Sequence, residues 1–202
     1  MRLVQSFLLA ATSIALAAVP RHGQSAAATQ LDTPGHVEVN GRSTPFLIRH
    51  LPVSSFPQLP VAVQRVLNQR GCVIPQTYEA HAPENVISAS LKRRGSVDWA
   101  VLCSARGTVS LLVFWADSAA EPTVLASAPE TERLEAHGAD GVLGFDWGID
   151  AASPEQVHEA QAGMKNRPPL LDHDALADSR IDQTTVYHYF SANAWTVVPT
   201  QD

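Results

Sequence analysis

Apolar and polar residues alternate with a period of two in several parts of the chain, a pattern typical of β-strands that bury one face. Three such runs, separated by short turns, fill residues 85–116 and predict a three-stranded meander. Near the C-terminus the runs 185–190 and 194–198 flank a short turn, which predicts a β-hairpin. The second and third strands of the meander are apolar on both faces, so we expect them to lie centrally under a helix.

Two segments have a helical pattern instead. Residues 60–70 carry apolar side chains at the spacing of one helical stripe, and Gly71 follows as a stop in the left-handed conformation. Ser153 and Gln156 have the spacing of a capping box. They predict a second helix that runs to about Met164.

These elements predict the α+β class: a mainly antiparallel β-sheet, built from the meander and the C-terminal hairpin, with a helix packed on one face. We expect one domain over residues 51–202, preceded by a flexible arm or edge strand over residues 29–50.

Gly138, Gly141 and Gly144 do not have the spacing of a dinucleotide fingerprint, and we interpret them as turn residues.

The amino terminus has the features of a secretory signal peptide. Arg2 is followed by an apolar stretch over residues 3–19, and small residues near Ala27 and Ala28 suit cleavage there. Cleavage after Ala17 and a retained membrane anchor are the alternatives. With residues 1–28 removed, we expect a periplasmic or secreted protein with no stable membrane insertion.

The chain has two cysteines, Cys72 and Cys103. Disulfides persist in oxidising compartments, so an exported chain with two cysteines is expected to pair them. The bridge would close a loop of about 32 residues, for which chain entropy gives about 3–4 kcal/mol of stabilisation. A redox or nucleophilic thiol is the alternative, although the C-x-x-C spacing is absent.

The charge balance limits the choice of partners. The formal net charge is −6. Cleavage of residues 1–28 would remove two arginines and no acidic residue, which gives −8. This balance disfavours nucleic acids and other phosphate-rich partners. Phosphate-loop and nucleophile-elbow motifs are absent from the sequence, and we expect no cofactor.

The segment Asp172-His173-Asp174 is the strongest candidate for chemistry, with Asp178 four residues further on. Carboxylates and an imidazole this close together could bind a divalent metal ion, or one aspartate could orient His173 as a general base. The alternative is structural. Asp174 and Asp178 would then frame a short turn over residues 175–177, or cap a following helix.

The C-terminal hairpin supplies candidates for binding. Alternation places Tyr187 and Tyr189 on one face, and together with Trp195 across the hairpin they could form an aromatic platform for a sugar or peptide. His188 lies on the opposite, apolar face. There we expect a histidine whose hydrogen bonds are satisfied within the core or at its edge.

Two further acidic residues, Asp98 and Asp146, each precede a tryptophan. We interpret both as an aspartate that holds a turn backbone beside a core ring.

Residues 85–102 resemble the strand–turn–strand unit of FG-GAP hairpins over a small part of the chain. Residues 92–95 are basic where that family has an acidic calcium loop, so neither calcium binding nor a propeller carries over, and we assign no family.

We therefore expect a monomeric, non-enzymatic binding or inhibitory module whose partner is an envelope protein or glycan. The alternative is a small metal-dependent or hydrolytic enzyme that uses the Asp172-His173-Asp174 segment. Convergence of these three residues with His188 in a concave pocket would favour the enzyme.

Overall fold

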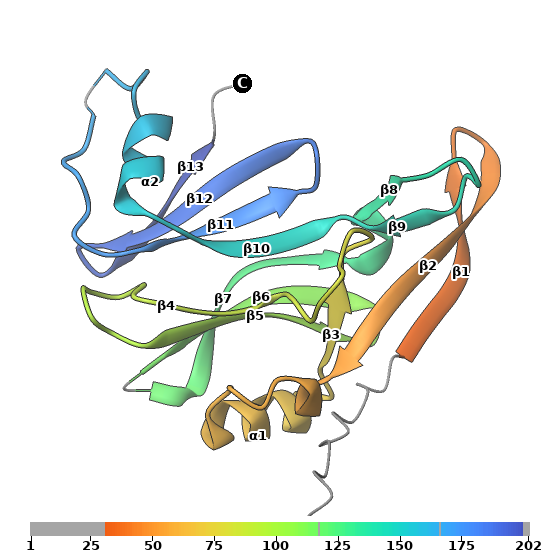
Figure 1. Cartoon of the computed structure of the whole chain (residues 1–202), viewed down its shortest axis with the longest axis horizontal. Helices are drawn as coiled ribbons and strands as arrows, with labels where there is room; N and C mark the ends of the chain where they lie inside the picture. Colours follow the sequence, from red (N-terminus) through yellow and green to blue (C-terminus); the bar gives the residue numbers. More distant parts are fainter. Residues whose placement is uncertain (1–30, 117, 166, 200–202) are drawn as a thin grey trace, which may run out of the picture.

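The computed structural model describes residues 31–116, 118–165 and 167–199 (Figure 1). The predicted signal peptide lies outside these ranges. Two β-sheets, which we call sheet A and sheet B, are stacked face to face, and Figure 1 shows one helix on the outer side of each. None of the helices in these ranges is long and apolar enough to span a membrane.

Sheet A has nine strands and is antiparallel at every pairing except that between β2 and β9. Its strand order is β7-β6-β5-β3-β2-β9-β8, with β1 paired to β2 and β4 paired to β5. The strands are β1 (Leu31–Val39), β2 (Arg42–Pro52), β3 (Val73–Gln76), β4 (Val86–Ala89), β5 (Asp98–Ala105), β6 (Thr108–Trp115), β7 (Ser118–Pro129), β8 (Leu134–Ala136) and β9 (Leu143–Phe145).

The predicted meander is present as β4, β5 and β6. Residues 29–50 were expected to form an arm or an edge strand, and their described part forms two strands. β1 is an edge strand, because β2 is its one partner among the described residues. β2 is interior, because it pairs with β1 on one side and with β3 and β9 on the other.

Sheet B is a separate antiparallel sheet of four strands, β10 (Trp147–Ala152), β11 (Ala175–Arg180), β12 (Thr184–Ser191) and β13 (Ala194–Pro199), paired in chain order. The C-terminal hairpin is present as β12 and β13. It belongs to this second sheet, whereas the sequence predicted a single sheet that contains both the meander and the hairpin. Trp147, Ile149 and Leu176 face inward and pack on Leu102 and Leu111 of sheet A. Alternation identifies a buried face but not the sheet that covers it.

Helix α1 (Val61–Arg70) covers the outer face of sheet A through Val63 and Leu67, as predicted. It ends at Gly71, whose φ of 71° is left-handed. The predicted disulfide between Cys72 and Cys103 is confirmed and ties the end of this helix to β5.

Helix α2 (Pro154–Ala160) lies on the outer face of sheet B, where Val157 is fully buried. The capping box of Ser153 and Gln156 is confirmed. The helix is shorter than predicted, because apolar packing on sheet B ends near Ala160 and Met164 is 45% exposed. Another helical turn would therefore bury little apolar surface.

Candidate functional site

The predicted catalytic segment is held by contacts within the fold. In His173, Nδ1 lies 2.8 Å from Asp172 Oδ1, and Nε2 lies 2.8 Å from the carbonyl oxygen of Phe190. Both partners accept hydrogen bonds, so a metal ion or a substrate proton would have to displace one of them. Asp174 Oδ2 accepts a hydrogen bond from the backbone N–H of Ser90 at 2.9 Å, which ties this segment to the end of β4.

The prediction of a turn over residues 175–177 is wrong, and so is the alternative prediction of a helix that follows Asp174. These residues begin β11, and Asp178 is a buried member of that strand. Because the chain alternates there, Asp178 points into the space between the sheets, where it accepts hydrogen bonds from Trp147 Nε1 at 2.6 Å and His188 Nε2 at 3.1 Å. His188 is thus a satisfied core histidine, as expected.

The two histidines therefore take different partners and do not form one pocket with Asp172 and Asp174. Over the described ranges, no group of three or more histidine, cysteine, aspartate or glutamate side chains is placed to hold a metal ion.

The three aromatic residues of the predicted platform do not share a face. Tyr189 is 6% exposed and lies against the α2 side of sheet B, with Tyr187 packed beside it. Trp195 lies opposite Phe190 in the register, so it points to the other side, where it stacks on Trp115 with ring centroids 5.5 Å apart. The platform prediction is wrong because the register, not the proximity along the chain, decides which rings meet.

The prediction that Asp146 holds the backbone of a turn is also wrong. The side chain is fully buried, and among the described residues neither of its carboxylate oxygens has a hydrogen bond. Arg180 Nε lies 3.4 Å away as an ion-pair partner. Burial raises the pKa of Asp146, while Arg180 and Arg133 oppose that shift.

The neighbouring Arg133 guanidinium lies 3.9 Å from the ring centroid of Trp147, and its ion pair with Asp178 measures 3.6 Å. Arg133 comes from sheet A's side of the interface, directly after the short helix η2 (Glu130–Glu132). This cluster is therefore part of the joint between the two sheets.

A different region has the form of a binding site. We call it the Tyr78 cleft: a cleft of about 290 Å³ between β2, the end of β3 and the loop that joins β8 to β9. Its floor and walls combine apolar and polar side chains: Leu47, Val142, Phe145, Arg49, Gln76, Tyr78, His137 and Asp140. A second hollow of about 180 Å³ continues on the other side of Arg49 and Gln76.

The central feature of the Tyr78 cleft is a stacked pair of rings. The rings of Tyr78 and His137 are 4.7 Å apart at their centroids and inclined by 3°. Gly144 of β9 lies directly against this pair. A Cβ atom at this position would lie 2.5 Å from Tyr78 Cβ and 2.6 Å from His137 Nε2, so only glycine fits without a shift.

This glycine was predicted to be a turn residue, which is wrong, because it belongs to a strand and its role is close approach. Gly138 and Gly141 do lie in the loop, with φ of 70° and 71°. The three glycines thus shape the loop that carries His137 and Asp140 and the space into which the rings fit.

Hydrogen bonds fix one wall of the Tyr78 cleft. Arg49 donates from Nη2 to the carbonyl oxygen of Thr77 at 2.6 Å and from Nη1 to that of Ala80 at 3.2 Å. Gln76 donates to the carbonyl oxygen of Glu84 at 3.1 Å and accepts from the same residue's N–H at 3.0 Å. The loop over residues 77–84 is therefore held in position from both ends.

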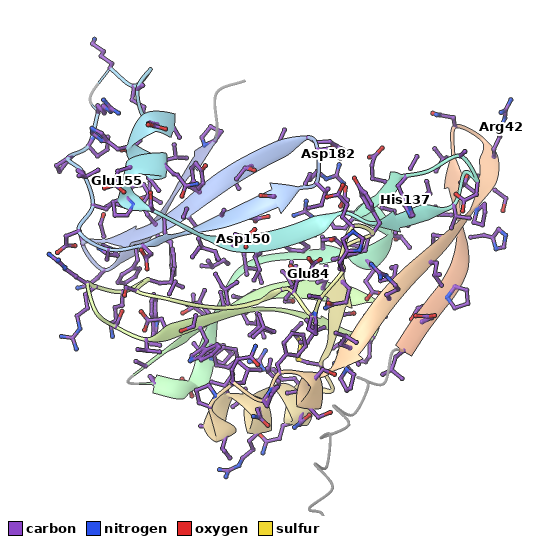
Figure 2. The ribbon with its side chains drawn as sticks, viewed as in Figure 1. Arg42, Glu84, His137, Asp150, Glu155 and Asp182 are labelled. Carbon is purple, nitrogen blue, oxygen red and sulfur yellow. A yellow bond between two sulfur atoms is a disulfide. The ribbon has the colours of Figure 1, made fainter. Side chains whose placement is uncertain are left out.

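The rim of the cleft is acidic. Figure 2 shows Asp182, from the turn between β11 and β12, and His137 at the same end of the molecule. The Tyr78 hydroxyl donates to Asp182 Oδ2 at 3.4 Å. Burial and the nearby charges of Asp182, Glu79 and Glu135 raise the pKa of Tyr78.

No protein-family model, curated protein or solved structure matches this chain. The site therefore has to be interpreted from its own geometry. Sequence reasoning missed Tyr78, Arg49 and His137 because no motif contains them and their spacing follows from the pairing of β2 with β9. The available signal was Gly144, a glycine within an apolar run, which marks close backbone approach.

Proposed function

We propose that the protein is a non-enzymatic binding module of the periplasm or the secreted space, and that an envelope protein or glycan places a positively charged group in the Tyr78 cleft. The observation that carries the proposal is the stacked Tyr78–His137 pair, seated against Gly144 beneath an acidic rim. Hydrogen bonds of Arg49 and Gln76 to the loop over residues 77–84 hold one wall of the cleft in position, which limits the ordering free energy lost on binding.

A cation suits this cleft for two reasons. The face of an aromatic ring carries partial negative charge and attracts an ammonium or guanidinium group. The charges of Asp182, Glu79 and Glu135 act on the Tyr78 hydroxyl and would act equally on a cation beside it. Arg49 lines the cleft on the side of the second hollow, and its charge would repel a cation from that side. Amines of this kind occur on proteins and on amino sugars.

The lining residues support binding more than catalysis. They include no serine, threonine, cysteine or lysine, and Tyr78, His137 and Asp140, which could take part in nucleophilic or acid–base chemistry, already make contacts within the fold. Asp140 accepts a hydrogen bond from the N–H of Val142 at 3.2 Å, which shapes the loop. No structural observation favours the alternative of an enzyme built on His173, because both of its ring nitrogens already have partners.

Binding of amine-bearing probes tests the proposal. We would titrate the purified protein with a lysine-containing peptide and a glucosamine oligosaccharide, using the N-acetylated form of each as the neutral counterpart. We expect binding of at least one amine form, with the acetylated form at least tenfold weaker, because acetylation removes the charge.

Tyr78→Ala should weaken that binding at least tenfold. Tyr187→Ala is the matched control, since it removes the same side chain from the α2 side of sheet B. Equal affinity for the amine and acetylated forms, or unchanged binding by Tyr78→Ala, would contradict the proposal.

A further inference from the structure

Positive and negative residues are segregated along this acidic chain. Residues 39–78 contain four arginines and no aspartate or glutamate, and residues 99–116 contain Arg106 and again no acidic residue. The first stretch includes α1, and the second includes the β5–β6 hairpin except its first residue, Asp98. Both contribute to the outer side of sheet A, because α1 packs there on Val101 and Leu112.

A hollow lies between these two elements, and we call it the α1 cleft. It has a volume of about 530 Å³ and lies between the last turn of α1 and the β5–β6 hairpin. Its donors are the side chains of Gln69, Arg70, Arg106, Thr108 and Ser110, and none of the residues that line it is acidic.

The backbone holds both arginines in place. Arg70 is the last residue of α1, where Gly71 ends the helix and the Cys72–Cys103 disulfide fixes the following residue to β5. Arg106 occupies the tight turn between β5 and β6, with φ of 54°. Arg70 and Arg106 therefore line the cleft from two different elements, and the backbone of each element is fixed there.

Neither Arg70 nor Arg106 has an ion pair or side-chain hydrogen bond with another described residue. By contrast, Arg133 and Arg180 are neutralised by buried aspartates. Arg65 extends the positive surface into an adjoining hollow of about 470 Å³ on α1. The charge at the α1 cleft is thus available to a ligand.

We propose that the α1 cleft binds a phosphate group, with Arg70 and Arg106 as its two charged donors and Gln69 and Thr108 as neutral donors. Guanidinium groups match the oxygens of phosphate in pairs, and two of them directed at one space bind more strongly than either alone. This site lies apart from the Tyr78 cleft and does not depend on the function proposed for it. The net charge of the chain disfavours phosphate on average, but this region differs from the average.

A paired set of variants tests the site. Arg70→Gln/Arg106→Gln removes both charged donors at exposed positions. Arg42→Gln/Arg93→Gln is the matched control, because it changes the net charge equally at exposed positions outside the cleft. Figure 2 shows Arg42 at the tip of the β1–β2 hairpin, away from α1.

Two arms distinguish the source of the phosphate. Inorganic phosphate is titrated by NMR of the arginine side chains, and vesicles of phosphatidylglycerol are compared with vesicles of phosphatidylcholine by co-sedimentation. We expect the Arg70/Arg106 variant to weaken binding at least tenfold and the control less than twofold. Loss confined to the phosphatidylglycerol arm would assign a lipid headgroup, and loss in the inorganic arm a free phosphate. Absence of binding in both arms, or equal loss in both variants, would overturn the proposal.

Discussion

The Tyr78 cleft and the α1 cleft lie on the same sheet but are built differently. In the Tyr78 cleft, close packing of two rings on Gly144 makes the surface, and carboxylates surround it. In the α1 cleft, a helix end and a hairpin turn hold two unpaired arginines over an open stretch of sheet. The Tyr78 cleft depends on the absence of a side chain at Gly144. The α1 cleft depends on the disulfide and on the β5–β6 turn, which place exposed arginine side chains.

Removal of the disulfide should have the largest effect and should separate the two clefts. We expect Cys72→Ser/Cys103→Ser to lower the free energy of unfolding by about 3–4 kcal/mol, since the bridge restricts the unfolded chain. Thermal unfolding measures this change. Phosphate binding should weaken in the same variant, because Cys103 lines the α1 cleft, whereas binding at the Tyr78 cleft should persist at temperatures where the protein is folded. Equal loss at both sites would show that they are not independent.

Substitution of Gly144 should affect mainly the other site. Gly144→Ala forces a Cβ atom against Tyr78 and His137, so we expect about 1–3 kcal/mol of destabilisation and loss of amine binding. Gly148→Ala is a milder control, because its Cβ would meet Ile181 at 3.1 Å, which is the end of a flexible side chain. Phosphate binding should be unchanged in both. Denaturant unfolding gives the stability, and a Gly144→Ala protein with wild-type amine affinity would contradict this account of the site.

The smallest expected effect is on the titration of Tyr78. Its pKa is raised by burial first, and then by Asp182, Glu79 and Glu135. Asp182→Asn removes one charge, so we expect this pKa to fall toward its ordinary value while remaining above it. The phenol is neutral until the pH approaches that pKa, so the stability at neutral pH should not change through this group. NMR titration of the tyrosine ring checks the shift, and an unchanged pKa would show that Asp182 does not contribute to the rim.

The aspartates that precede Trp99 and Trp147 show how far local sequence reasoning extends. Asp98 was predicted to hold a turn, and it accepts hydrogen bonds from the N–H groups of Lys92 and Ala116 at 2.8 and 3.0 Å. Asp146 has the same neighbour in sequence but is buried beside Arg180, a residue 34 positions away. The first environment is made within the β4–β5–β6 meander, and the second exists only once the two sheets have packed.

The candidate sites follow the same division. The pairing of Cys72 with Cys103 could be predicted from the sequence, because an exported chain, as the amino terminus predicts, leaves few alternatives for two cysteines. The prediction of an aromatic platform from Tyr187, Tyr189 and Trp195 is wrong. Which of these rings share a face depends on the register of β12 with β13, which the sequence does not specify. The Tyr78 cleft could not be predicted, because its rings are 59 positions apart and meet through a parallel contact between β2 and β9.

The sequence by itself determined the elements whose signals are local: the meander, the stop of α1 at Gly71, the capping box of α2 and the turn that carries Arg106. Backbone dihedrals and short hydrogen-bonded rings set these features within a few residues. Tertiary structure alone decided that the hairpins form two stacked sheets and that a strand glycine makes room for two rings. It also brought uncompensated arginines from a helix and a turn to one cleft. Those outcomes depend on which faces bury each other, and alternation along the chain specifies a face without specifying its partner.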